Sequence, residues 1–228
     1  MKISIKDRVN NQRGIAFTLV AVMAFVLIGL TAFAVDLSNI YMVLNELHNA
    51  ADAGALAGAR FLYNDDGTQV NVGVNQIAYD AATANAAQSI SGTIAVDVNW
   101  SSGQNLGANV DVQRGHWSFG LGSLERGFYP SDNLTPPDLW NLSTVDLDED
   151  RHFVNAVRVA ARRQRSGSGT TASPTASFFA RIFGIDNFDL SREAVAYLGF
   201  AVNLGPGEAD QPIAICRQSI LNQFGEYT

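Results

Sequence analysis

A run of 21 uncharged residues, 15–35, constrains this chain more than any other part of its sequence. As a helix it would be about 31 Å long at 1.5 Å per residue, which matches the hydrocarbon core of a bilayer, about 30 Å thick. Twelve of its residues are Ile, Leu, Val or Phe, and together they favour insertion by roughly 5 kcal/mol. The sequence therefore predicts one transmembrane helix over 15–35.

The charges on either side of this run predict its orientation. The first fourteen residues hold four basic side chains and one acidic one, and Asp36 follows the run directly. Because basic flanks stay on the cytoplasmic side, residues 1–14 are predicted to be cytoplasmic and the chain after Asp36 extracytoplasmic. A cleaved secretory signal is the alternative, since Ala32 and Ala34 form an A-x-A-like site. The apolar run, however, is longer than the roughly 7 to 15 residues of such signals.

Helical periodicity continues beyond the apolar run. Apolar or small residues recur at alternating spacings of three and four: Leu37, Ile40, Leu44, Leu47, Ala51, Gly54 and Gly58. Such spacing is typical of a helix with one packed face. We therefore expect the transmembrane helix to extend over 36–62 outside the membrane.

The outer half of this helix carries a strip of very small residues. Ala50, Gly54 and Gly58 repeat every four residues, so another backbone could approach the helix closely along this line. The candidate helix-docking residues are Leu44, Leu47, Ala50, Ala51, Gly54 and Gly58. Two occupants are open at this point: the chain's own domain, or a helix of another subunit.

The remainder, 63–228, reads as one α+β domain. Turn-forming residues at 64–67 end the long helix. A second helix is expected over 75–89 and a short amphipathic helix over 177–183. Alternating segments at 93–100, 108–119, 153–161 and 190–202 predict about four strands, which would form a small antiparallel sheet. Residues 224–228 form no recognisable closing element, so we expect the domain to be incomplete at its C-terminus.

Charge and chemistry exclude several classes of function. From Gly14 onward the chain has 11 Arg and 21 acidic residues, a net charge of −10, which disfavours nucleic acid as a partner. His48, His116 and His152 have no His or Cys neighbour at metal-ligand spacing. Motifs for a nucleophilic serine, a zinc protease or a phosphate-binding loop are missing as well. We therefore expect no enzyme activity, no cofactor, no catalytic or structural metal and no small-molecule substrate.

One rival function comes from another class. The acidic run Asp146, Asp148, Glu149 and Asp150 could supply oxygen ligands to a hard cation, although without the spacing of an EF-hand. Together with Trp100, Trp117 and Trp140 it would suit a tethered or secreted adhesin-like domain that binds carbohydrate or a cation. This stays the alternative hypothesis.

Three stretches of the sequence resemble a known family. Arg13-Gly14 opens the apolar run, Ala34-Val35-Asp36-Leu37 leaves it, and the segment LHNAADAGALAGA at 47–59 follows on the exposed helix. Weaker matches lie at 153–159, 178–184 and 194–196. On these motifs the chain resembles the TadE/TadG-like proteins of the tight-adherence, Flp-type pilus assembly system.

The resemblance implies a non-enzymatic, membrane-anchored component of pilus assembly, either minor pilin-like or an inner-membrane scaffold. Such a protein would sit in a bacterial inner membrane with a single span and a periplasmic body. Its partners would be the lipid bilayer and other Tad components, reached through helix packing. Gly14 would be the processing residue, yet Leu19 stands at the fifth place after it, where pilin-like members carry Glu. We therefore expect the N-terminus to be retained.

Overall fold

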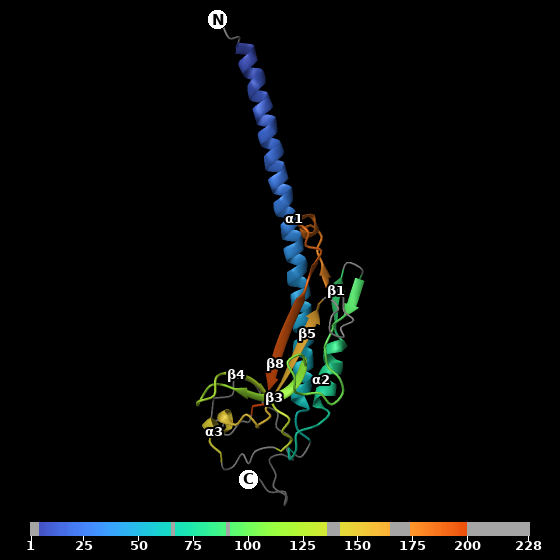
Figure 1. Ribbon diagram of the computed structural model, residues 1–228, viewed down its shortest axis with the longest axis vertical. Coiled ribbons are helices and arrows are strands. Elements are labelled where there is room, and N and C mark those ends of the chain that lie inside the picture. Colours follow the sequence, from blue (N-terminus) through green and yellow to red (C-terminus); the bar gives the residue numbers. More distant parts are fainter. Residues whose placement is uncertain (1–4, 65–66, 90–91, 136–141, 165–173, 200–228) are drawn as a thin grey trace, which may run out of the picture. The chain divides into compact units, whose positions relative to one another are not determined.

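A single unbroken helix, α1 (Ile5–Arg60), forms the first quarter of the chain. The computed structural model describes residues 5–64, 67–89, 92–135, 142–164 and 174–199 (Figure 1). α1 contains no proline that would interrupt its hydrogen bonds. Its last turn tightens where the N–H groups of Phe61 and Leu62 donate to the carbonyls of Gly58 and Ala59. The predicted extension of the helix beyond the apolar run is confirmed, and it ends two residues before the expected limit.

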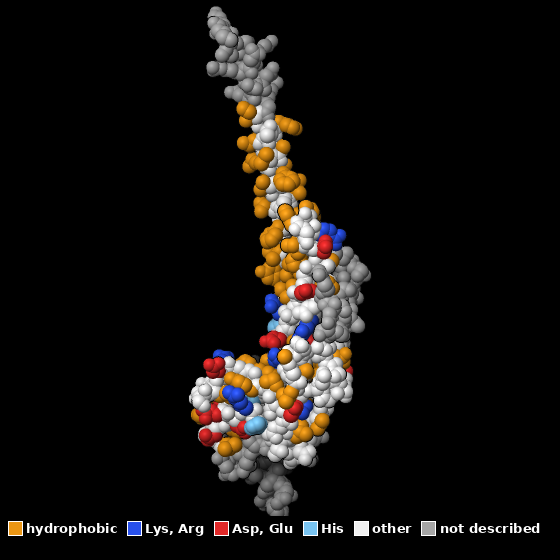
Figure 2. All heavy atoms as spheres, in the orientation of Figure 1, with side chains coloured by type: hydrophobic (Ala, Val, Ile, Leu, Met, Phe, Trp, Pro, Cys, Tyr) orange, Lys and Arg blue, Asp and Glu red, His pale blue; other side chains and the backbone are white. Residues whose placement is uncertain are grey.

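The two halves of α1 lie in different surroundings. Among the described residues, α1 is the one helix long and apolar enough to cross a membrane, with a mean hydropathy of 2.5 in its most apolar window and none of that window buried. Asp36 is the first buried residue after the apolar run. From Val43 onward one face of the helix is covered by the domain. Figure 2 shows hydrophobic side chains along the uncovered half of the helix.

A second helix and a hairpin follow α1. Helix α2 (Val74–Thr83) packs on α1, and strands β1 (Ala86–Ser89) and β2 (Gly92–Ala95) pair antiparallel. The expected helix over 75–89 is therefore six residues too long, and its last four residues form a strand. Alanine is the strongest helix former, but helix propensity is a weak local preference that tertiary pairing routinely overrides. Ala87 is fully buried in the core from its place in β1.

The main sheet has four antiparallel strands in the order β4-β3-β5-β8. They are β3 (Val112–Ser118), β4 (Gly127–Pro130), β5 (Ala156–Arg163) and β8 (Leu190–Tyr197). A further pair, β6 (Thr175–Ala176) and β7 (Asn187–Phe188), encloses the 3₁₀ helix η1 (Ala180–Phe183). The expected α+β class and small antiparallel sheet are confirmed, and the expected helix at 177–183 is a shorter 3₁₀ turn.

The stretch 120–150, which lacks periodicity in the sequence, contains strand β4 and the short helix α3 (Thr144–Glu149). Ser143 caps α3: its hydroxyl accepts from the N–H of Asp146, whose carboxylate accepts in turn from the backbone N–H of Ser143. The helix has only six residues, which is too short for a periodic signal. The cap at Ser143 therefore fixes the start of α3, and pairing with β3 fixes the position of β4.

One face of the sheet forms the core with the helices. Along β5, Val157, Val159 and Ala161 are fully buried, while Arg158 and Arg162 on the other face are half-buried. This alternation is expected of a strand with one covered face. The covered face packs on α1, which lies alongside β5 and β8 and against α2 (Figure 1). The second half of α1, from Val43 onward, is therefore part of the core of the domain.

Candidate functional site: the face of α1 that holds the domain

The small-residue strip of α1 is where the helix and the domain approach most closely. A Cβ atom on Gly54 would lie 2.8 Å from the carbonyl oxygen of Ala78 and 2.9 Å from the Cβ of Ala82, both in α2. On Gly58 it would lie 2.8 Å from Cγ1 of Val157 in β5. All three distances are shorter than van der Waals contact allows. The two glycines are therefore what permits α2 and β5 to pack directly on the backbone of α1.

The predicted docking residues lie on this covered face. Leu47, Ala50 and Ala51 are fully buried in the core of the domain, and Gly54 and Gly58 are also buried, while Leu44 is half-buried. The sequence left open whether the chain's own domain or a helix of another subunit packs on the small-residue strip. In the structure, the chain's own domain packs there. A helix of another subunit finds no room at Gly54 and Gly58 because α2 and β5 already fill the space.

A second contact lies where α1 leaves the apolar run. The carboxylate of Asp36 accepts hydrogen bonds from three successive backbone N–H groups, those of Phe178 at 2.7 Å, Phe179 at 3.1 Å and Ala180 at 2.6 Å. These N–H groups stand at the start of η1, where a helical turn leaves its first donors unpaired. Asp36 therefore joins the end of the membrane-type helix to a segment 142 residues later in the chain.

The electrostatics of this contact favour the charged carboxylate. Burial alone would raise the pKa of Asp36, but the N–H groups of Phe178, Ala180 and Phe179 outweigh it and hold the pKa below its ordinary value. Asp36 is only 5% exposed, so the bonds are shielded from water. In the sequence, Asp36 directly follows the apolar run and belongs to one of the motifs that carry the family resemblance. The sequence does not indicate which groups donate hydrogen bonds to Asp36.

One further hydrogen bond and one electrostatic interaction join α1 to the domain. The side-chain amide of Asn39 donates to the carbonyl of Ala176 at 3.4 Å, one turn beyond Asp36. Arg163, at the end of β5, is almost fully buried, and burial lowers the pKa of its guanidinium, while the nearby carboxylate of Glu46 on α1 raises it in part. Together with the glycine strip, these contacts attach the domain along α1 from residue 36 to residue 58.

The acidic run of the rival hypothesis is used within the chain. The carboxylate of Asp148 accepts from the backbone N–H groups of Phe119 at 2.6 Å and Leu121 at 2.8 Å and from the hydroxyl of Ser118 at 3.0 Å. These bonds lower the pKa of Asp148 although burial opposes them. The carboxylate of Glu149 accepts from the N–H of Ser123. Asp148 and Glu149 therefore hold the loop after β3. The described residues contain no cluster of three or more His, Cys, Asp or Glu that could bind a metal.

Of the tryptophans in the same hypothesis, Trp100 makes contacts within the domain. The ring of Trp100 packs on Tyr79, with ring centres 5.3 Å apart, and its N–H donates to the carbonyl of Gln104 at 2.7 Å. Trp117 is half-buried in β3, and Trp140 lies outside the described residues. Trp100 therefore serves the packing and hydrogen bonding of the domain.

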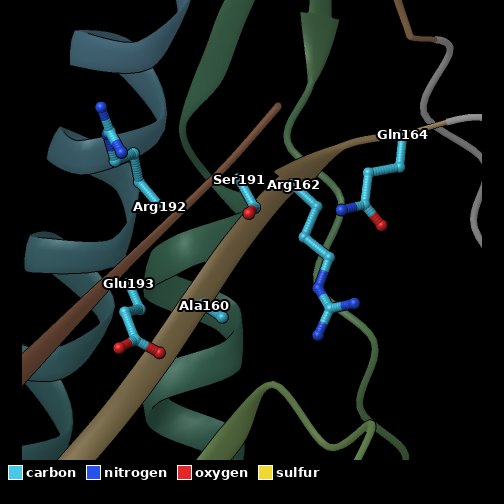
Figure 3. A pocket seen from close by; sticks show the side chains of 6 residues that line it. All are labelled: Ala160, Arg162, Gln164, Ser191, Arg192 and Glu193. Atoms are coloured by element: carbon cyan, nitrogen blue, oxygen red, sulfur yellow. The ribbon is translucent and has the colours of Figure 1, made fainter. Parts of the chain in front are cut away.

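A shallow polar hollow of about 400 Å³ lies on the uncovered side of the sheet, between β5 and β8 (Figure 3). Ala160 and Arg162 of β5 face it together with Ser191 and Glu193 of β8, which are their partners in the strand register. The Arg162 guanidinium is paired with the buried carboxylate of Asp111. The hollow thus offers charge and hydrogen bonds, but its lining supplies neither a nucleophile activated by a base nor a set of metal ligands.

The arrangement defines a class of protein: an α+β domain built directly on the continuation of an apolar, membrane-type helix. Comparison with family models gives two matches, one over the helix and one over the domain. Residues 14–60 match the family described as Flp pilus-assembly TadE/G-like, and residues 57–196 match the family described as Tad-like Flp pilus-assembly. The chain therefore belongs to the Tad family of Flp pilus-assembly proteins, as its resemblance predicted. Comparisons with curated proteins and with solved structures gave no match.

The two matched regions correspond to the two halves of the fold. The first covers α1 from Gly14 to Arg60, and the second begins in the last turn of α1 and extends to Ala196 in β8. Asp36 falls in the first region, and its three N–H donors fall in the second. The contact described above therefore joins the region that matches the TadE/G-like family to the region that matches the Tad-like family.

Proposed function

We propose that this chain is a non-enzymatic assembly component of the Flp pilus that is anchored in the bacterial inner membrane by residues 15–35. Residues 1–14 lie in the cytoplasm and the domain lies in the periplasm, because the basic residues precede the apolar run. Its partners are the bilayer and other pilus components.

One observation carries the proposal: the helix that is apolar and exposed in its first half is the core helix of the domain in its second half. With no linker between them, a displacement of the membrane half is transmitted directly to the domain. The contacts of Gly54, Gly58 and Asp36 strengthen this coupling. A rigid anchor of this kind suits a structural subunit that must hold an orientation relative to the membrane.

Between the two structural roles, we favour an inner-membrane scaffold over a minor pilin. The position five residues after Gly14 holds Leu19, where the pilin-like relatives in the resemblance carry glutamate. Gly14 itself lies within α1. The adhesin-like alternative gains no support, since the carboxylates of Asp148 and Glu149 already accept hydrogen bonds from the chain's own backbone.

Deleting the gene and restoring it on a plasmid tests this proposal. Cells that lack the chain should lose surface pili in electron micrographs and in sheared-pilus fractions, and the full chain should restore them. A scaffold should stay in the membrane fraction with its N-terminus intact. Recovery from sheared pili of a form that begins at Ile15 would instead favour the minor pilin, and normal piliation without the gene would contradict both roles.

Orientation is tested separately with a reporter fused after Thr228. Alkaline phosphatase, which folds only outside the cytoplasm, should be active there, and a cytoplasmic reporter at the same place should be inactive. The opposite pattern would overturn the proposed orientation without affecting the family assignment.

A further inference from the structure

A short apolar loop, residues 178–185, exposes large hydrophobic side chains beside α1. Phe183 is 84% exposed and Ile182 is 76% exposed, which makes them among the most exposed hydrophobic residues outside α1. Phe178, Phe179 and Ile185 are exposed as well. A cluster of this kind marks a surface that contacts an apolar partner rather than water.

The position of the apolar loop indicates what that partner is. Between the loop and α1 lies an apolar groove of about 500 Å³. Its wall on the α1 side includes Phe25, Ile28, Gly29, Ala32 and Phe33, which belong to the apolar run. Its other wall includes Phe179, Ile182, Phe183 and Ile185 of the loop. Figure 2 shows the hydrophobic surface of α1 continuing onto the adjoining end of the domain.

Several backbone groups of the apolar loop are hydrogen-bonded within the protein and so do not need water as a partner. Its first three N–H groups donate to the carboxylate of Asp36. At its other end the N–H groups of Gly184 and Ile185 donate to the carbonyls of Arg181 and Ala180, at 3.0 and 3.1 Å. The hydroxyl of Ser177 donates to the carbonyl of Ile185. Unpaired backbone groups are what keeps loops out of lipid, and these bonds remove part of that penalty.

We propose that the apolar loop inserts into the bilayer that α1 spans, in the leaflet next to the domain, and that lipid acyl chains fill the groove. The inference rests on the proposed membrane anchor, because one wall of the groove is the membrane-spanning run. Interfacial elements of this kind enter about 5 to 10 Å below the headgroups. The exposed side chain of Arg181 in η1 can reach back to the lipid phosphates. The domain is then held to the membrane at two points, which fixes the tilt of α1 and the domain relative to the bilayer.

Fluorescence from single cysteines in the full chain tests the insertion. Cys216 is the only cysteine of the sequence, so a Cys216→Ser background accepts one new site at a time. Phe183→Cys reports on the apolar loop, Phe25→Cys on the apolar run, and Leu121→Cys, 57% exposed in the loop after β3, serves as the matched control. Each variant is labelled with an environment-sensitive dye and reconstituted at low protein density into vesicles of phosphatidylcholine with a minor share of phosphatidylglycerol.

Insertion predicts that the dye at position 183 shifts to the blue and is quenched by lipids brominated along their acyl chains, as at position 25. The dye at position 121 should show neither effect. A water-like spectrum at 183 together with quenching at 25 would overturn insertion while leaving the membrane anchor in place. A blue shift at 183 that is insensitive to brominated lipid and grows with protein density would also overturn it, in favour of a second copy of the chain. Loss of quenching at position 25 would refute the anchor itself, and insertion with it.

Discussion

Replacing Asp36 by asparagine should release the start of η1 from α1. The carboxylate accepts from three N–H groups, whereas an asparagine side chain keeps one acceptor oxygen and points its NH₂ group at the remaining donors. A hydrogen bond to a charged acceptor contributes about 1.5 to 3 kcal/mol against about 1 kcal/mol for a neutral one, and a buried N–H left unpaired costs about 1 to 3 kcal/mol. The local cost of Asp36→Asn is therefore about 3 kcal/mol, or roughly a hundred-fold in the opening equilibrium.

Hydrogen exchange of the full chain in lipid nanodiscs measures this effect. The amides of Phe178, Phe179 and Ala180 should exchange roughly a hundred-fold faster in Asp36→Asn than in the unmodified chain. Asp52→Asn is the matched control, because Asp52 lies on the same helix, is partly exposed and pairs only with His48 at 3.5 Å among the contacts described. Equal exchange in the two variants would refute the reasoning that Asp36 holds this segment.

The same contact should depend on pH in a defined direction. The pKa of Asp36 in the folded protein lies below its ordinary value of 3.8, so its contribution to stability is complete above that value. It is lost as the pH falls through the lower, folded pKa. Exchange at residues 178–180, corrected for its intrinsic rate, should therefore stay constant from neutral pH to about pH 5 and accelerate only below about pH 4. A change near pH 6 would point to a different group.

Two further variants, each with its own control, test the close packing. Gly54→Leu combined with Gly58→Leu should displace α2 and β5 from α1 and destabilise the domain by more than about 3 kcal/mol, seen as loss of the protein from membranes. Gly29→Leu, where a Cβ meets nothing within 4 Å, should leave its abundance unchanged, and equal abundance of all variants would contradict the packing. Gly115→Ala should separate β4 from β3, because its Cβ would overlap the backbone of β4, and lower the free energy of unfolding by about 2 to 4 kcal/mol. Gly127→Ala, which has open space, should change the midpoint of thermal unfolding little, and similar midpoints for both alanine variants would argue against the overlap.

The sequence alone determined the features that depend on local patterns. An uncharged apolar run of bilayer length, followed by three-and-four spacing without a proline, is enough to predict one helix through and beyond 15–35. Alternation at 153–161 and 190–202 was enough to place β5 and β8 within a few residues. In these segments the residues that establish the pattern are neighbours in the chain, so no knowledge of the fold was needed.

Only the tertiary structure decided what covers α1 and what Asp36 binds. The strip at Gly54 and Gly58 shows that a backbone approaches, but a glycine has no side chain whose chemistry could identify its partner. α2 and β5 take that place because the sheet and α2 bury their apolar faces there. The donors to Asp36 are backbone N–H groups, which every residue except proline carries, and they stand 142 to 144 positions away. Their meeting follows from the fold of β6, η1 and β7 against α1, and no pattern within either segment encodes it.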